Sequence, residues 1–169
     1  AMGGGQPGSP PAYNNTEEYN GSAWTNVTAL PAGRGYGIGY GPQTAAKQVS
    51  GYSGTAYLTT TFDYDGSSFT AAPATSNGRQ DGAGAGNDNT SGVITGGYIP
   101  AATTATEEYG GTSWTAGGAL STARMNASGA GLQTSAFLAG GIGSPNSMVT
   151  TVEHYDGSSW TSGTAMPVE

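Results

Sequence analysis

The stretch VEHYDGSSWT, residues 152–161, occurs three more times with small changes in this chain of 169 residues. The other copies are TEEYNGSAWT at 16–25, TFDYDGSSFT at 61–70 and TEEYGGTSWT at 106–115. Each copy has a β-prone run, a turn rich in small and polar residues, and then a large aromatic residue. Repetition of this kind indicates a chain built from similar structural units.

Three sets of landmark residues share one period. The tyrosines are 45, 45 and 46 residues apart, and the large aromatic residues follow with the same steps. The three arginines are also 45 residues apart, and each follows its aromatic residue by ten. The landmarks are Tyr19, Tyr64, Tyr109 and Tyr155; Trp24, Phe69, Trp114 and Trp160; and Arg34, Arg79 and Arg124. Within each period four short β-prone runs alternate with turn residues, and no segment has helical spacing.

Four short antiparallel strands in about 45 residues are typical of a β-propeller blade, so we expect an all-β fold. The aromatic landmarks should fill the space between neighbouring blades. We expect a partial blade at 1–31, with only its third and fourth strands, and full blades at 32–76, 77–121 and 122–169. The start, AMGGG, resembles an expression scar, and GGG at 3–5 stands where a second strand would end.

The order of motifs in the last repeat resembles the kelch repeat: FLAGG at 137–141, VEHYDGSSW at 152–160 and AMP at 165–167. The resemblance covers nearly the whole chain, and the Gly/Thr-rich composition of the repeats is similar to that of repeats in phage and marine microbial proteins. Phe69 in place of Trp and Ser50-Gly51 in place of Gly-Gly depart from the pattern. The resemblance implies a kelch-like β-propeller with four-stranded antiparallel blades, in a virion-associated or extracellular setting.

Charge and composition exclude several classes of function. Four basic and 11 acidic residues give a net charge of −7, which cannot form the basic face that nucleic-acid binding needs. No apolar run is long enough to insert into a membrane. The chain has no cysteine, and its single histidine, His154, has no second histidine to share a metal, so we expect no metal and no cofactor.

The arginines are expected to be structural, each opening an innermost strand and pairing with a third-strand carboxylate. The carboxylates assigned to these ion pairs are Glu18, Asp63, Glu108 and Glu153. The alternative is a ring of positive charge at the mouth of the propeller axis that binds an anion. Because the carboxylates recur in every repeat, a single acid–base active site is not expected, and we predict a non-enzymatic protein.

Residues just after each arginine differ between repeats and should lie near the axis opening. They are Tyr36, Gln80, Asp81, Met125 and Asn126. Such side chains suit a polar ligand such as a sugar, through stacking and hydrogen bonds. The alternative is sequence drift in exposed loops.

Three full blades and one partial blade do not obviously close a ring, because closed propellers have about four to eight blades. We expect a homo-oligomer that completes the ring, with a surface glycan or a protein as a further partner. A compact four-bladed ring and a piece of a longer array are the other options. The alternative functions are a kelch-like enzyme acting on a carbohydrate, of the oxidase or epimerase type, and an evolved or engineered repeat fragment that self-assembles.

Overall fold

The computed structural model describes residues 13–167, and within them every regular element is a β-strand. No helix that could cross a membrane occurs in this part of the chain. The predicted all-β class and the four-stranded antiparallel units are confirmed. The proposed scar and the GGG at 3–5 lie outside the described residues.

Three sheets of four strands follow one another along the chain, each in simple up-and-down order. The first sheet contains β3 (Ile38–Tyr40), β4 (Ala46–Val49), β5 (Thr61–Tyr64) and β6 (Phe69–Ala72). The second contains β7 (Ala83–Asp88), β8 (Ser91–Thr95), β9 (Thr106–Tyr109) and β10 (Trp114–Ala116). The third contains β11 (Ser128–Leu132), β12 (Ser135–Ala139), β15 (Val152–Tyr155) and β16 (Trp160–Ser162).

Two hairpins complete the structure. The first, formed by β1 (Thr16–Tyr19) and β2 (Trp24–Val27), precedes the first sheet and has no further strands paired with it in the described residues. We call it the N-terminal hairpin. The second, formed by β13 (Ile142–Gly143) and β14 (Ser147–Met148), is inserted between β12 and β15. The sequence did not predict this insertion.

In three of the four repeats the side chain that follows the tyrosine closes the outer turn, whereas in the second sheet that residue is Gly110. In the third sheet, Asp156 accepts hydrogen bonds from the backbone N–H groups of Ser158 and Ser159, both at 2.8 Å. Asp65 makes the same bonds in the first sheet, and Asn20 makes them in the N-terminal hairpin. Gly157, with φ of 94°, supplies the left-handed conformation that the turn requires. This chemistry explains the Asp-Gly-Ser-Ser motif.

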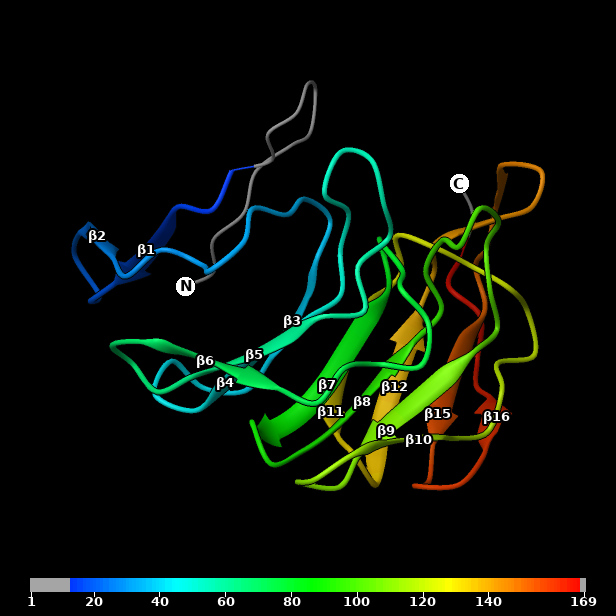
Figure 1. Ribbon diagram of the computed structural model, residues 1–169. Coiled ribbons are helices and arrows are strands. Elements are labelled where there is room, and N and C mark those ends of the chain that lie inside the picture. Colours follow the sequence, from blue (N-terminus) through cyan, green and yellow to red (C-terminus); the bar gives the residue numbers. More distant parts are fainter. Residues whose placement is uncertain (1–12, 168–169) are drawn as a thin grey trace.

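The three sheets spread like a fan from their innermost strands. β3 lies against β7, and β7 lies against β11, while the outer strands diverge (Figure 1). The N-terminal hairpin and β16 lie at opposite sides of the molecule in that view. The arrangement is consistent with a β-propeller-like fold, and the described residues form an open arc rather than a closed ring.

Glycines allow the large inner side chains of the first sheet to approach the second. Tyr40 lies so close to Gly92 that a Cβ atom there would stand 2.3 Å from the tyrosine ring. Ile38 and Tyr40 share a buried cluster with Ile94, Tyr109 and Trp114 of the second sheet. The Gly-rich runs of the sequence therefore leave room for the neighbouring sheet's side chains.

Candidate functional site

Each sheet holds one fully buried arginine immediately before its innermost strand. In all three, Nη1 donates to two backbone carbonyl groups, at the end of the second strand and before the third. The acceptors are Ser50 and Thr60 for Arg34, at 2.8 and 3.0 Å; Gly96 and Ala105 for Arg79, at 3.2 and 2.9 Å; and Gly140 and Thr151 for Arg124, at 3.2 and 2.9 Å. The arginines thus join the strands of their own sheet.

Two of the arginines also form buried ion pairs. Arg79 Nη2 lies 2.5 Å from Glu107 Oε1, and Arg124 Nη2 lies 2.5 Å from Glu153 Oε1. The second carboxylate oxygen of Glu107 accepts the backbone N–H of Ser76 at 2.7 Å, so both of its oxygens have donors. Burial lowers the pKa of Arg79, and Glu107 opposes that shift. With every arginine buried, a positively charged ring at the axis mouth does not form, and that alternative is wrong.

The expected ion pairs were partly wrong. Arg79 pairs with Glu107 rather than Glu108, because neighbouring residues of a strand point to opposite faces. Arg34 has no carboxylate partner among residues 13–167: Phe62 occupies the position of Glu107, and the guanidinium lies 4.8 Å from the Phe62 ring centroid. Burial lowers the pKa of Arg34 to about 10.

Glu18 and Glu108, also expected to pair with arginine, instead link neighbouring sheets. Tyr64 of the first sheet donates its hydroxyl to Glu18 of the N-terminal hairpin at 2.8 Å, and Tyr155 of the third sheet donates to Glu108 of the second. Burial, followed by the bond to Glu18, raises the pKa of Tyr64 to about 12. In these two joints, the glutamate that precedes one tyrosine accepts the hydroxyl of the tyrosine in the next sheet.

Asp63 holds the equivalent position in the first sheet, and its partner is Lys47 rather than an arginine. Lys47 is fully buried, and its Nζ lies 3.8 Å from the ring centroid of Tyr109 in the second sheet. Burial lowers the Lys47 pKa, whereas the bond to Asp63 raises it. A charged pair over an aromatic ring thus replaces the tyrosine-to-carboxylate bond in this joint.

The aromatic residues that were expected to pack between sheets form four cross-strand pairs with similar geometry. Their ring centroids are 5.2, 4.5, 5.1 and 4.8 Å apart in the pairs Tyr19–Trp24, Tyr64–Phe69, Tyr109–Trp114 and Tyr155–Trp160. Two of the indoles also reach the preceding sheet. Trp114 Nε1 donates to the Pro73 carbonyl at 2.9 Å, and Trp160 Nε1 donates to Thr106 Oγ1 at 3.0 Å.

The pair in the N-terminal hairpin departs from this pattern. Tyr19 is 45% exposed and Trp24 is 61% exposed, whereas Tyr109 and Trp114 are 3% and 8% exposed. Within residues 13–167 no sheet covers this aromatic pair, so the expectation that Tyr19 and Trp24 pack between sheets is wrong for that part of the chain. We call the surface formed by Tyr19 and Trp24 the head face.

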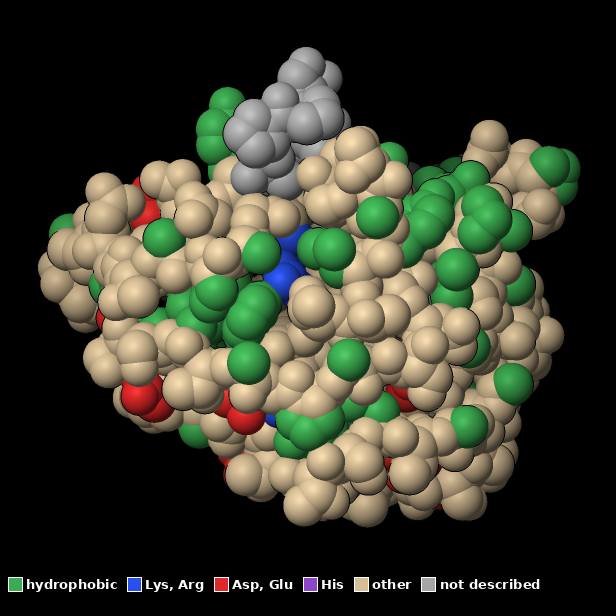
Figure 2. Space-filling model, viewed as in Figure 1, with side chains coloured by type: hydrophobic (Ala, Val, Ile, Leu, Met, Phe, Trp, Pro, Cys, Tyr) green, Lys and Arg blue, Asp and Glu red, His purple; other side chains and the backbone are tan. Residues whose placement is uncertain are grey.

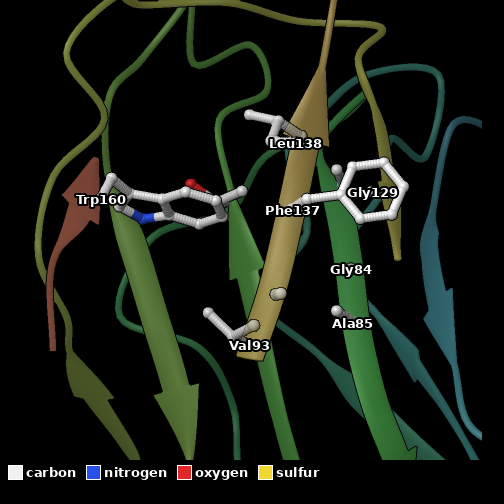
Figure 3. Close-up of a pocket in the computed structure, with 10 residues that line it drawn as sticks. Gly84, Ala85, Val93, Gly129, Phe137, Leu138 and Trp160 are labelled. Atoms are coloured by element: carbon white, nitrogen blue, oxygen red, sulfur yellow. The ribbon is translucent and has the colours of Figure 1, made fainter. Parts of the chain in front are cut away.

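The far side of the third sheet is the opposite end of the arc. Phe137 on β12 is 42% exposed, and the neighbouring His154 on β15 is exposed as well. Figure 3 shows the Phe137 side chain extending away from Trp160, which lies on the side packed against the second sheet. We call the surface formed by Phe137 and His154 the tail face.

The predicted ligand-binding residues lie in one line across the inner ends of the three sheets. Tyr36, Asp81 and Asn126 all have positive φ, of 55°, 56° and 54°, and are joined by backbone bonds. Asp81 N–H donates to Tyr36 O at 3.0 Å, and Asn126 N–H donates to Asp81 O at 2.8 Å. Asp and Asn tolerate this conformation well, which offers a structural reason for their presence.

Gln80 and Met125 lie beside this line, in single bridges with Tyr98 and Ile142. Gln80 donates to the half-buried Asp81 at 2.9 Å, and burial raises the pKa of Asp81. Met125 also lines a hollow of about 170 Å³ with loop residues of the second and third sheets. The other lining residues include Tyr98, Pro100, Pro145 and Asn146, which sequence analysis missed because loop proximity leaves no periodic signal.

Charged side chains are sparse on the face seen in Figure 2, where small hydrophobic groups alternate with neutral polar surface. Among residues 13–167 no three His, Asp or Glu side chains gather in a way that could hold a metal ion. In the part of the chain that the structure describes, the head face and the tail face are the two surfaces at the ends of the arc that no neighbouring sheet covers.

Comparison with known proteins identifies a solved structure with a similar fold. No protein-family model and no curated protein matches the sequence. Among solved structures, the one titled "Structure of YjhT" is similar, with a TM-score of 0.65 and 15% sequence identity. The match covers 83% of this chain and 48% of that chain, so the present chain spans about half of its structural neighbour's length. At this identity the likeness concerns the fold alone.

Proposed function

We propose that this chain is a non-enzymatic kelch-type β-propeller module, with a structural or binding role, that completes its ring by self-association. The kelch motifs, the four-stranded sheets and the fold likeness to a chain about twice as long support the propeller assignment. The Gly/Thr-rich repeats support a virion-associated or extracellular setting for the assembly.

A single observation carries the self-association. The same kind of aromatic pair is buried at the joint between the first and second sheets and largely buried at the next joint, where Trp160 is partly exposed, but it is exposed in the N-terminal hairpin. Large exposed aromatic surfaces are typical of interaction sites, and Tyr and Trp are the residues that contribute most to interfaces. A second copy offers a surface that already fits such a pair, because the chain packs its own pairs in this way.

The test is the mass of the protein in solution over a wide range of concentration, measured by sedimentation or native mass spectrometry. The proposal predicts a discrete assembly with a small whole-number multiple of 16.7 kDa, which dissociates on dilution. A protein that stays monomeric at every concentration would contradict the proposal. Growth into assemblies without a size limit would contradict ring completion.

A recognition role is the second candidate, favoured by the hollow of about 170 Å³ beside Met125. Its lining combines a tyrosine and two prolines with the polar side chains of Ser144 and Asn146, a mixture that suits a sugar. Screening the assembled protein on a glycan array tests this role. Binding that is lost in Met125→Trp, which would fill the hollow, supports it, and the absence of binding to any glycan contradicts it.

A further inference from the structure

Resting on the proposed self-association, we infer that the copies join head to tail. The head face of one copy packs on the tail face of a second, so that Tyr19 lies against Phe137 and its hydroxyl reaches His154. The two exposed ends of the arc would thus pack on each other in the same way as neighbouring sheets pack within one chain.

The joints inside the chain follow one rule. A tyrosine on the third strand of one sheet contacts a side chain on the second strand of the preceding sheet. Tyr109 lies under Lys47 of the first sheet, and Tyr155 shares a buried cluster with Val93 of the second. Lys47 and Val93 are 0% and 1% exposed, so this position on the second strand is buried wherever another sheet follows.

Phe137 holds the same position in the third sheet. Lys47, Val93 and Phe137 each lie three residues before the turn that ends the second strand, at Ser50-Gly51, Gly96-Gly97 and Gly140-Gly141. Phe137 differs in being 42% exposed, because no sheet follows the third one within the described residues. A tyrosine is what covers this position at both other sheets.

His154 holds the matching position on the third strand. It lies directly across from Phe137 in the strand register, just as Glu108 lies across from Val93. Glu108 accepts the hydroxyl of Tyr155. An imidazole nitrogen can also accept a hydroxyl proton, so His154 supplies the same kind of partner without adding a carboxylate to an acidic chain.

The two rings of the head face already have the geometry of a buried pair, and only the Tyr19 hydroxyl, which donates to the Gly21 carbonyl at 2.9 Å, has to turn towards His154. The Tyr19–Trp24 ring distance of 5.2 Å matches the 5.1 Å of the buried Tyr109–Trp114 pair. The pair is held across the hairpin by strand pairing of the same register. A preorganised aromatic pair loses little conformational freedom on docking, which favours association.

The two faces differ, so the joint is heterologous and the copies must close a ring or grow into a filament. Two copies contribute six four-stranded sheets and two hairpins, within the range of about four to eight blades for closed propellers. Three copies would bring nine such sheets and exceed that range. The inference therefore specifies a two-copy ring with two identical head-to-tail joints.

The experiment blocks one face at a time. Tyr19→Asp should disable the head face and Phe137→Asp the tail face, and each variant alone should raise the dimer dissociation constant at least about 30-fold. Mixed in equal amounts and distinguished by a mass tag, the two variants should form a one-to-one heterodimer through their single intact joint. That heterodimer should be weaker than the wild-type dimer and stronger than either variant with itself.

A matched control introduces the same charge outside both faces. Thr112→Asp, at an exposed position in the outer turn of the second sheet, should keep assembly within about threefold of wild type, because surface substitutions away from an interface cost little. Where Phe137→Asp lowers the unfolding midpoint, His154→Trp replaces it, because added bulk on an exposed strand blocks docking without disturbing the core. Circular dichroism monitors the fold of each variant.

The outcomes separate the two claims. A wild-type protein that never assembles overturns the proposed self-association itself. A wild-type protein that assembles, with variants whose mixture stays monomeric, overturns only the head-to-tail arrangement. Loss of assembly in just one of the two blocked variants would indicate a joint between like faces and would also overturn it.

Discussion

The hairpin β1–β2 and the strand pair β9–β10 have nearly the same sequence and the same backbone pairing, yet different surroundings. TEEY followed by a turn and Trp forms both. In β9–β10, Trp114 is 8% exposed and Glu107 is paired with Arg79, whereas Trp24 and Glu17 of the hairpin are exposed. The motif determines the local shape, and the neighbouring sheet determines whether its aromatic and acidic groups stabilise the fold.

Removing the aromatic residue should give the largest difference between the two regions. Trp114→Ala should lower the free energy of unfolding by about 3–5 kcal/mol, because a buried ring and its bond to Pro73 are lost. Trp24→Ala should change it by less than about 0.5 kcal/mol in the dilute, monomeric protein. Urea unfolding at low protein concentration measures both, and equal effects would contradict the contrast.

The glutamates provide the next comparison. Glu107→Ala leaves Arg79 buried without its carboxylate and should cost about 3 kcal/mol or more. Glu17→Ala changes the equivalent residue of the hairpin, which is exposed, and should lie within about 0.5 kcal/mol of wild type. Chemical denaturation of the dilute protein compares the two; a small loss in Glu107→Ala would show that the ion pair is dispensable.

A glycine pair tests the close approach between the first and second sheets. Gly92→Ala places a Cβ 2.3 Å from the Tyr40 ring and should destabilise the protein by about 1–3 kcal/mol. Gly110→Ala, where no atom lies within 4 Å of the added Cβ, serves as the control and should be nearly neutral. Thermal unfolding of both variants measures the difference in stability. An unchanged unfolding midpoint in Gly92→Ala would mean that the first and second sheets are farther apart than described.

The turns should give the smallest effect, visible only in acid. Hydrogen bonds from Ser159 and Ser158 lower the pKa of Asp156 from 3.8 to about 2. A folded-state pKa below the unfolded value means that the stabilisation is complete above pH 3.8 and is lost as the pH falls towards about 2. Asp156→Asn, which copies Asn20, should reduce the fall in unfolding midpoint over this window, and an unchanged acid profile would contradict the assignment.

Sequence alone predicted the period, the four-strand units and the packing of aromatic residues at the joints between the three full sheets, because these depend on short-range patterns that repeat. It assigned Glu108 instead of Glu107 as the carboxylate that pairs with Arg79. Because side chains alternate along a strand, only one of these two glutamates can face the arginine, and Phe62 beside Arg34 in the first sheet marks the same position as Glu107. Lys47 with Asp63 could not be foreseen, since no other repeat has a lysine there.

The remaining gaps have physical reasons. Asp and Asn readily adopt positive φ, but Tyr does not. The sequence therefore did not predict that Tyr36, Asp81 and Asn126 share a left-handed backbone conformation at the inner ends of the three sheets. The hairpin β13–β14 interrupts the repeat in a loop without alternating apolar residues. The exposure of the ends depends on which neighbours are present, which a local motif cannot encode.

Oxidative footprinting of the intact wild-type protein, at concentrations below and above assembly, tests the central claim most directly. The account predicts that Trp24, Tyr19 and Phe137 are labelled in the dilute protein and become protected together as the assembly forms. Trp114 and Tyr155, already sealed inside the chain, should be protected at both concentrations. Continued labelling of Trp24 and Phe137 in the assembled protein would contradict the account.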